Sequence, residues 1–309
     1  MASLLVNIPL IGLFACVFSV ILLVPANESV LLSMRAKQAS KYRPVVIVHG
    51  ILDHALELIH LQLNIQKAHP GTDVYLIPLY QYIKSAWPMW TQVTGFGDYI
   101  RNVSDAHPDG IILIGYSQGG LICRAVIQVR AVLNIHTYIS LASPQMGQYG
   151  DTNYLYLFPN YMKDNLYKLL YSRFGQTFSV GGYWKDPHHY DLYQSTSTFL
   201  PVLNNETLVP SPNMTLYRRN MLRLKKFIMI GGPDDGVVTP WQSSHFGFYN
   251  ENETVVPFQQ QEIYRRDSFG LRTLDKRGDL VILEKAGVHH TQWHVDPIVF
   301  RDLIEPWLS

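Results

Sequence analysis

The sequence predicts an α/β fold in which a mostly parallel β-sheet is flanked by helices. Two observations support this class. Short β-branched runs alternate along the chain with longer segments of helical periodicity, which is the pattern of strands joined by crossover helices. Of the 309 residues, 47% are hydrophobic and 16% are charged, so the chain can bury a core of full size within one domain.

The first elements are expected to form a βαβ unit. Residues 43–50 are a continuous apolar run, typical of a buried parallel strand, and 54–69 have helical periodicity before a second strand at 72–80. The same alternation continues toward the C-terminus. Further strands are expected at 110–116, 136–143, 224–232 and 278–287, and further helices at about 90–103, 118–130 and 293–308, the last interrupted by Pro297.

The alternation stops between about 144 and 223, where Tyr, Phe and Trp are frequent. We interpret this segment as a cap that is inserted between two strands of the sheet. Loops at the carboxyl ends of strands carry function on a rigid scaffold, so a cap is expected there. Its aromatic side chains could line a tunnel for an apolar substrate or pack as additional core, and the sequence leaves both readings open.

The first 26 residues are expected to be a signal peptide. No charged residue occurs from 4 to 24, and residues 11–24 are almost wholly aliphatic, which fits a secretory apolar region or a marginal membrane anchor. Val24 and Ala26 are compatible with cleavage after Ala26, although no Lys or Arg precedes the apolar run. We therefore expect residues 27–309 to form the folded domain, without a stable membrane span after removal of the signal.

Export through the secretory pathway would determine how the cysteines and the glycosylation sequons of the chain are interpreted. Cys16 lies in the expected signal peptide, so Cys123 is the only cysteine expected in the mature chain and no internal disulfide is expected. We interpret Cys123 as a small buried hydrophobic residue. In the secretory pathway, N-x-S/T sequons are surface acceptors for glycans. Five such sequons are present, at Asn27, Asn102, Asn205, Asn213 and Asn252.

The charge balance excludes some classes of partner at the level of the whole chain. The formal net charge is +1, and basic and acidic residues are interspersed along the sequence. Neither nucleic acid nor an anionic membrane surface is therefore expected as a partner.

A candidate nucleophile lies in "GYSQGG" (115–120). Residues 115–119 match GxSxG directly after an apolar strand and directly before a helix, which is the context of a nucleophile elbow. Glycines two positions on either side of Ser117 allow the strained turn to pack closely. The backbone N–H of Gln118 at the helix start is expected to bind a developing oxyanion. An ordinary turn could produce the same string, but its position favours catalysis.

A serine nucleophile needs a base and a carboxylate, which follow it in the order Ser, Asp, His in α/β-hydrolases. The turn after the strand at 224–232 contains two acids, Asp234 and Asp235. We favour Asp235 as the acid because it precedes Gly236 and an apolar pair. Asp234 could instead cap the turn through an Asx-type hydrogen bond.

Three histidines follow the last expected strand. We favour His290 over His289 as the base because the polar residues after it indicate that the chain has left the strand. His294 is expected to begin the closing helix in a packing or capping role. His290 and His294 are four residues apart, but no Glu lies between them as in HExxH zinc sites, so no metal site is expected.

The second oxyanion donor is expected after the first strand, in "HGILDH" (49–54). Gly50 would let the chain approach the serine, and the backbone N–H of Ile51 would point at the substrate oxygen. His49 would brace this loop. An ordinary turn between strand and helix accounts for the glycine equally well. It does not explain why the ends of three separate strands carry the residues that one catalytic site needs.

The chain from 43 onward resembles the palmitoyl-protein thioesterases in four strings: "GYSQGG" (115–120), "SPQMGQYGD" (143–151), "GGPDDGVVTPWQSSHFGFY" (231–249) and "HHTQWH" (289–294). The resemblance implies a lysosomal α/β-hydrolase that cleaves fatty-acyl thioesters and needs no cofactor, over the catalytic domain 27–309. It implies delivery by a sorting receptor that reads glycans. It also implies a triad of Ser117, Asp235 and His290 and an oxyanion hole at Ile51 and Gln118. Family members usually carry more cysteines, which puts a disulfide-stapled cap in doubt here.

Three functions remain open at this point. A thioesterase that works through an acyl-enzyme is the leading hypothesis. An oxygen-ester lipase or esterase has the same triad, and the residues alone do not distinguish the two. A hydrolase-fold module that binds a partner without catalysis is disfavoured by the intact order of Ser, Asp and His.

Overall fold

The computed structural model describes residues 41–150 and 165–309. The expected signal peptide, the sequon at Asn27 and residues 151–164 of the expected cap lie outside these ranges.

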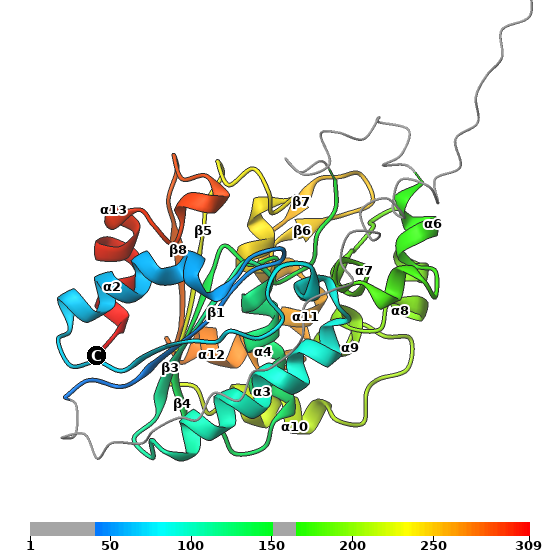
Figure 1. Cartoon of the computed structure of the whole chain (residues 1–309). Coiled ribbons are helices and arrows are strands. Elements are labelled where there is room, and N and C mark those ends of the chain that lie inside the picture. Colours follow the sequence, from blue (N-terminus) through cyan, green and yellow to red (C-terminus); the bar gives the residue numbers. More distant parts are fainter. Residues whose placement is uncertain (1–40, 151–164) are drawn as a thin grey trace, which may run out of the picture. The chain divides into compact units, whose positions relative to one another are not determined.

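A six-stranded, fully parallel sheet forms the centre of the described chain, in the order β2-β1-β3-β4-β5-β8 (Figure 1). All six expected strands are present, and the prediction of an α/β fold is confirmed. The strands that carry continuous β-branched runs are buried on both faces, as the runs indicated. They span Val45–Val48 (β1), Val74–Leu76 (β2), Ile111–Tyr116 (β3), Ile135–Leu141 (β4), Lys226–Gly231 (β5) and Leu280–Glu284 (β8).

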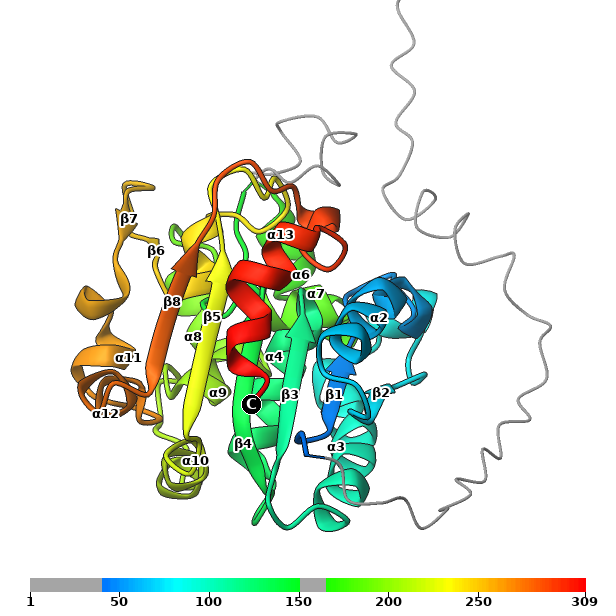
Figure 2. The ribbon, with the colours of Figure 1, turned by 90° about the vertical axis from the view of Figure 1, so that its left-hand side faces the viewer.

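Helices cover both faces of the sheet, as Figure 2 shows. On one face lie α2 (Ile59–Ala68), which follows the 3₁₀ turn η1 (Ala55–Leu58), and the short α13 (Pro297–Val299). The opposite face carries α3 (Met89–Asp105), α4 (Gln118–Val129) and α10 (Met214–Met221). Successive strand residues point to opposite faces, so alternate residues of β1 join two separate cores.

The closing helix differs from the prediction of a helix over 293–308 that Pro297 interrupts. Pro297 is instead the first residue of α13, where its missing N–H costs no hydrogen bond. The side chain of Asp296 caps this helix by accepting from the N–H groups of Ile298 and Val299, at 2.7 and 3.3 Å. The chain continues as a π-helical turn, η7 (Phe300–Ile304), and a 3₁₀ turn, η8 (Glu305–Trp307).

From residue 165 onward, the segment between β4 and β5 forms short helices. Several of its aromatic side chains are fully buried, including Trp184, Tyr193 and Phe199, so these three serve packing. Its last helix, α10, packs on α4. The other elements of this segment are α6 (Leu166–Leu170), η3 (Gly175–Thr177), α7 (Ser179–Tyr183), α8 (Tyr190–Thr196) and α9 (Leu200–Asn204).

Several short elements had no counterpart in the sequence prediction. Two to six residues give too little periodicity for a helix or strand to be recognised. One is η2 (Tyr82–Ala86), which follows β2. Six lie between β5 and β8: η4 (Trp241–His245), β6 (Phe248–Tyr249), β7 (Val255–Val256), η5 (Phe258–Gln260), α11 (Glu262–Arg265) and α12 (Leu271–Lys276). A further one, η6 (His290–Gln292), follows β8.

Across the two described ranges, no helix combines the length and the apolar character that a membrane crossing requires.

Candidate active site

Ser117 lies at the turn between β3 and α4, with φ 53° and ψ −127°. This left-handed conformation is rare for a residue with a side chain and is typical of a strained functional turn. The turn packs tightly against the end of β1. A Cβ on Gly119 would lie 2.4 Å from the carbonyl oxygen of Val48, and a Cβ on Gly50 would lie 3.0 Å from Ser117 Cβ. Both positions therefore need glycine for close approach.

His290 and Asp235 meet Ser117 at the carboxyl edge of the sheet. The Nε2 atom of His290 lies 2.9 Å from Ser117 Oγ, and its Nδ1 atom lies 2.9 and 3.0 Å from the two carboxylate oxygens of Asp235. All three side chains are buried, with 7%, 5% and 2% of the surface of Ser117, His290 and Asp235 exposed. The two loops that carry His290 and Asp235 are joined directly, because His290 N–H donates to the Asp235 carbonyl at 2.9 Å.

The carboxylate of Asp235 accepts hydrogen bonds from three further donors. The N–H groups of Val237 and Val238 donate to Oδ1 at 3.0 and 2.8 Å, and the indole of Trp293 donates to Oδ2 at 2.8 Å. Asp235 therefore makes the Asx-type turn that the sequence analysis assigned to Asp234, and that assignment was wrong. Asp234 accepts instead from the distant N–H of Gly287 at 2.7 Å.

Two residues that contact Asp235 and the loop of His290 were not predicted from the sequence. Trp293 was quoted within "HHTQWH", but no local signal shows that its indole reaches Asp235. Tyr116, beside the serine, donates its hydroxyl to the carbonyl of His290 at 2.9 Å. The phenol thereby connects β3 to the loop that carries the imidazole.

The two neighbouring histidines lie elsewhere. His289 is exposed, and its Nδ1 atom lies 3.0 Å from the carbonyl of Asp234. His294 is buried and packs edge-on against Tyr116, with ring centroids 4.7 Å apart, and burial lowers its pKa to about 4. It does not begin the closing helix, which starts at Pro297. Within the described part of the chain, no three His, Cys, Asp or Glu residues gather as a metal site would require.

The loop after β1 is held by hydrogen bonds on both sides of Ile51. His49 bridges the loop to the end of β2, with Nδ1 2.9 Å from the carbonyl of Gly50 and Nε2 2.8 Å from that of Leu79. Leu52 N–H donates to Ser85 Oγ at 2.6 Å. These contacts fix the loop next to Ser117 and give His49 the bracing position that the sequence predicted.

The side chain of Gln118 belongs to the same network. Its Nε2 atom donates to the carbonyl of Ser85 at 2.7 Å. Ser85, which the sequence analysis did not identify, therefore ties the loop of Ile51 to the first residue of α4. The backbone N–H of Gln118 is in the first turn of the helix, where no intrahelical acceptor exists, so it suits a developing negative charge.

The two strings "SPQMGQYGD" (143–151) and "GPDDGVVTPWQSSHFGFY" (232–249), which carry the family resemblance, contact each other in the structure. Gln148 donates to the carbonyl of Val237 at 3.2 Å and accepts from the N–H of Thr239 at 3.1 Å. Ser243 donates its hydroxyl to the carbonyl of Gly147 at 2.6 Å. The first residues of the inserted segment therefore support the loop that carries Asp235.

The remaining predicted positions lie outside this site. Cys123 is fully buried in α4, and burial raises the pKa of its thiol. Among the sequons within the described ranges, Asn102, Asn213 and Asn252 are exposed. Asn205 is half-buried, and its side-chain oxygen accepts from Ser211 N–H at 3.2 Å.

A parallel sheet of this order, with a serine on the sharp turn after its third strand, is the architecture of the α/β-hydrolases, and the chain is one of them. The comparisons with known proteins refine this class. The palmitoyl protein thioesterase family model matches residues 44–290, and the chain belongs to that family of hydrolases. The family resemblance drawn from the sequence motifs is confirmed.

Individual relatives match over nearly the whole chain. Lysosomal thioesterase PPT2 of Homo sapiens is 48% identical over 291 residues, which cover 94% of this chain and 96% of the human protein. The PPT2 homolog of Drosophila melanogaster is 48% identical and covers 87% and 92%, respectively. Palmitoyl-protein thioesterase 3 of Dictyostelium discoideum is 32% identical and covers 84% and 89%. The solved monoacylglycerol lipase of Paleococcus ferrophilus has a TM-score of 0.45 at 16% identity, over 86% of this chain and 94% of the lipase.

Proposed function

We propose that this chain hydrolyses fatty-acyl thioesters through an acyl-enzyme formed on Ser117. The observation that carries the proposal is the continuous contact from Ser117 Oγ through His290 to Asp235, at 2.9 Å for each of the two links. Membership of the palmitoyl protein thioesterase family supports a thioester as the substrate.

In the first half-reaction, His290 Nε2 takes the proton of Ser117 as Oγ attacks the thioester carbonyl carbon. The backbone N–H groups of Ile51 and Gln118 stabilise the oxyanion of the tetrahedral intermediate, and Asp235 stabilises the imidazolium that forms. The intermediate collapses when its C–S bond breaks. The thiolate leaves with little need for prior protonation because a thiol is far more acidic than an alcohol, and the acyl group remains on Ser117. The imidazolium of His290 then gives its proton to the departing thiolate, so the neutral imidazole is restored before water enters.

The second half-reaction returns the serine to its free form. Water enters beside the acyl-enzyme, His290 removes its proton, and the hydroxide attacks the ester carbonyl. The new tetrahedral intermediate uses the same two N–H donors. His290 then protonates Ser117 Oγ as the C–O bond breaks, and the fatty acid leaves.

We place this activity in the lysosome, reached through the secretory pathway. The name of the human relative, 48% identical over nearly the full chain, supports the compartment. The apolar segment at 4–24 supports entry into the pathway as a signal peptide. Glycans on the sequon asparagines, of which Asn102, Asn213 and Asn252 are exposed, would be read by a sorting receptor.

The proposal is tested with purified protein and Ser117→Ala, on palmitoyl-CoA and on a matched pair of oxygen ester and thioester of one fatty acid. We expect wild-type hydrolysis of both thioesters, and a loss of about a thousandfold or more in kcat for the variant. Equal rates in the two proteins would remove the serine mechanism. A strong preference for the oxygen ester would make the chain a lipase. Failure of the wild type to react with a fluorophosphonate would indicate a binding module.

A further inference from the structure

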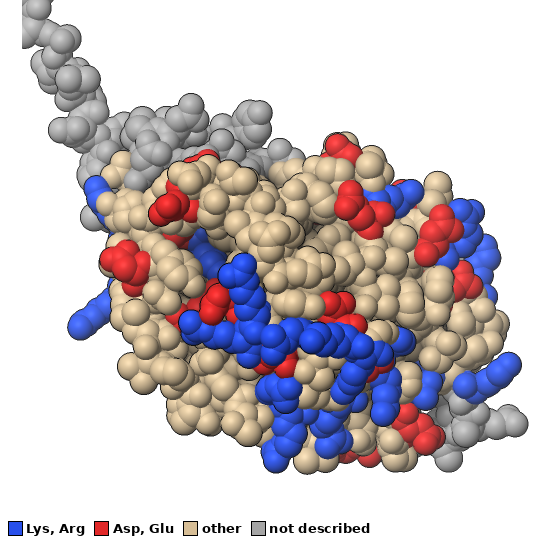
Figure 3. All heavy atoms as spheres, turned by 180° about the vertical axis from the view of Figure 1, so that it is seen from behind, with Lys and Arg blue, Asp and Glu red and all other residues tan. Residues whose placement is uncertain are grey.

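One surface of the described chain carries an excess of positive charge that the net charge of +1 conceals. We define the basic face as the exposed side chains of 214–226 and 262–279. It comprises α10, α11, α12 and the residues that lead into β5 and β8. These two segments contain ten Lys and Arg but four Asp and Glu. Figure 3, seen from behind, shows Lys and Arg side chains gathered on this side of the molecule.

The two segments of the basic face are in direct contact. The Arg277 guanidinium donates to the carbonyls of Leu222 and Leu224, both at 3.1 Å, and Lys226 donates to the carbonyl of Gly278 at 2.7 Å. The ends of α10 and α12 therefore lie side by side, and their cations belong to one continuous surface.

All four carboxylates of this face are engaged within it. The pairs are Arg218 with Asp267 at 2.8 Å, Arg266 with Glu262 at 2.5 Å, Arg277 with Asp279 at 2.7 Å, and the Tyr264 hydroxyl with Asp275 at 2.6 Å. Six cations of the face have no ion-pair partner within the described ranges: Arg219, Arg223, Lys225, Arg265, Arg272 and Lys276. Their charge is available to a partner.

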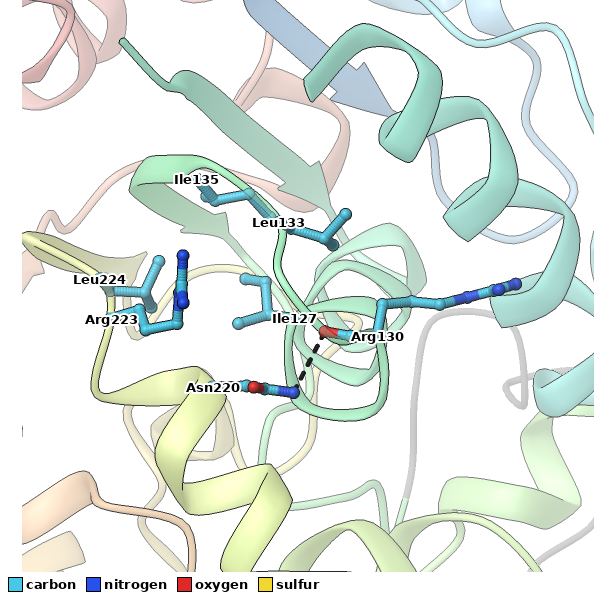
Figure 4. A pocket seen from close by; sticks show the side chains of 7 residues that line it. All are labelled: Ile127, Arg130, Leu133, Ile135, Asn220, Arg223 and Leu224. Atoms are coloured by element: carbon cyan, nitrogen blue, oxygen red, sulfur yellow. Dashed lines mark hydrogen bonds between the residues drawn. The ribbon is translucent and has the colours of Figure 1, made fainter. Parts of the chain in front are cut away.

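The basic face continues into an open groove of about 340 Å³ at the amino ends of β3, β4 and β5. Arg223, Lys225 and His136 line the groove together with one acid, Asp109, and the apolar Leu133. Figure 4 shows the adjoining seam between α4 and α10, where Arg223 extends beside the start of β4. Burial and the nearby charges of Arg43 and Lys225 lower the pKa of His136.

We propose that the basic face binds an anionic phospholipid surface, with a headgroup phosphate in the groove beside Arg223 and Lys225. The unpaired cations are spread over α10, α11, α12 and the turn after α10, and they do not converge on one small ligand, which fits a surface of many charges. An apolar side chain is exposed at the same edge, since Val132, next to the groove residue Leu133, has 65% of its surface exposed. Such a side chain can enter the headgroup region.

Binding through the basic face would leave the candidate active site accessible to substrate. Lys226 begins β5 at the basic face, whereas Asp235 follows the other end of the same strand. Six residues of a strand span about 20 Å, so a chain bound through this face directs Ser117 away from the lipid. The proposal departs from the expectation drawn from the sequence that no anionic membrane surface is a partner, because the even balance of charges along the chain does not describe their distribution over its surface.

The test compares co-sedimentation of the secreted protein with phosphatidylcholine vesicles and with vesicles that also contain phosphatidylserine. The variant carries Arg219→Glu, Arg223→Glu and Lys225→Glu, whose side chains make no hydrogen bond or ion pair within the described ranges. Its control carries Lys67→Glu, Lys84→Glu and Arg173→Glu, which are exposed, lie outside the basic face and change the net charge equally. We expect the basic-face variant to bind anionic vesicles about a hundredfold more weakly and the control to bind like the wild type.

Two further measurements distinguish electrostatic binding to the lipid from a general loss of folding or activity. Wild-type binding to the anionic vesicles should weaken steeply as salt is added, and all three proteins should hydrolyse a soluble thioester at the same rate. Equal binding to neutral and anionic vesicles, wild-type binding by the basic-face variant, or an equal loss in the control would overturn the proposal. Tighter binding to single-stranded RNA or heparin than to the vesicles at the same salt would also overturn it, in favour of a different polyanion.

Discussion

The carboxylate of Asp235 shows how local and distant contacts combine at a single residue. Its Oδ1 atom accepts from the N–H groups of Val237 and Val238, which belong to the same turn. His290 and Trp293 approach from a loop more than fifty residues further along the chain. The turn fixes the orientation of the carboxylate, and the fold then brings the imidazole and the indole to it. The neighbouring Asp234 lacks all four contacts and is oriented toward Gly287.

This difference predicts opposite results for two isosteric substitutions. Asp235→Asn should lower kcat for a thioester by about three to four orders of magnitude, because the amide no longer holds the imidazole in the productive tautomer. Asp234→Asn should retain activity within about a factor of three, since it loses one exposed hydrogen bond. Steady-state kinetics on both variants decide between the acids, and an equal loss in the two would contradict the assignment.

The indole of Trp293 acts through Asp235 rather than on the substrate. We expect Trp293→Phe to lower kcat about tenfold, because a hydrogen bond to a charged group contributes about 1.5–3 kcal/mol. KM should change little, since the side chain is fully buried and its indole N–H donates to Asp235. Trp307→Phe is the matched control, because this indole N–H has no hydrogen-bond partner within the described ranges. A change in KM alone, or the same loss of kcat in both variants, would refute a positioning role.

The sequence predicted Ser117, His290 and the favoured Asp235 because each follows a recognisable strand at a chemically distinctive turn. It could not predict Trp293, Tyr116 or Ser85. Their contribution depends on where the side chain points after the strands have assembled, and no local pattern contains that information.

At the scale of elements, a buried ionic network holds the inserted segment against the nucleophile helix. Arg124 of α4 is fully buried and donates to Asn204 of α9 at 2.7 Å. Asn204 donates in turn to Glu206 at 2.8 Å, and Glu206 pairs with Lys185 at 2.7 Å. Burial raises the pKa of Glu206, but the charge of Lys185 and three hydrogen-bond donors outweigh it and lower the pKa overall. For Lys185, burial outweighs the attraction of Glu206 and lowers the pKa, so the two partners share the cost of desolvation.

Breaking this pair on one side should be costly. Lys185→Met leaves the carboxylate of Glu206 buried without its cation, so we expect a loss of about 3–5 kcal/mol in the free energy of unfolding. The double variant Lys185→Met with Glu206→Gln removes the uncompensated charge and should recover part of that loss. Lys168→Met, an exposed lysine of the same segment, is the control. Urea unfolding measures all three, and a double variant less stable than Lys185→Met alone would contradict the argument.

Elements were predictable in proportion to their length and periodicity. The buried strands are continuous apolar runs, and the helices α2, α3 and α4 have helical periodicity over many residues. These elements were therefore predicted from the sequence. The closing helix was misjudged because Pro297 was taken as an interruption, whereas proline is favoured in the first turn. The two-residue strands β6 and β7 depend on each other for their hydrogen bonds, so neither has a signal of its own.

For the whole molecule, burial of two histidines couples folding to pH. His245 and His294 are buried, and desolvation lowers the pKa of each from an ordinary 6.5 to about 4. One ring nitrogen of each has no hydrogen-bond partner within the described ranges, so a second proton would be poorly accommodated. Among the charges near His294, Glu57 raises its pKa and His290 and His60 lower it, and desolvation outweighs them.

The sign of the pH dependence follows from these shifts. Between pH 6.5 and about 4, the unfolded chain binds a proton at each histidine and the folded chain does not, so acidification favours unfolding. Asp267 and Glu206, whose pKa values are lowered in the folded state, act in the same direction at still lower pH. We therefore expect the free energy of unfolding to fall from pH 7 toward pH 4, by on the order of 3 kcal/mol for each histidine.

His245→Gln tests the contribution of one ring, with the half-buried His107→Gln as the control. Urea unfolding across this pH range should give a shallower slope for His245→Gln than for the wild type, and an unchanged slope for His107→Gln. Identical slopes in the three proteins, or stability that rises toward pH 4, would contradict the coupling. If the chain works in the acidic lysosome, as proposed above, it operates below its stability maximum, and contacts such as the Lys185–Glu206 pair must supply the remaining stability.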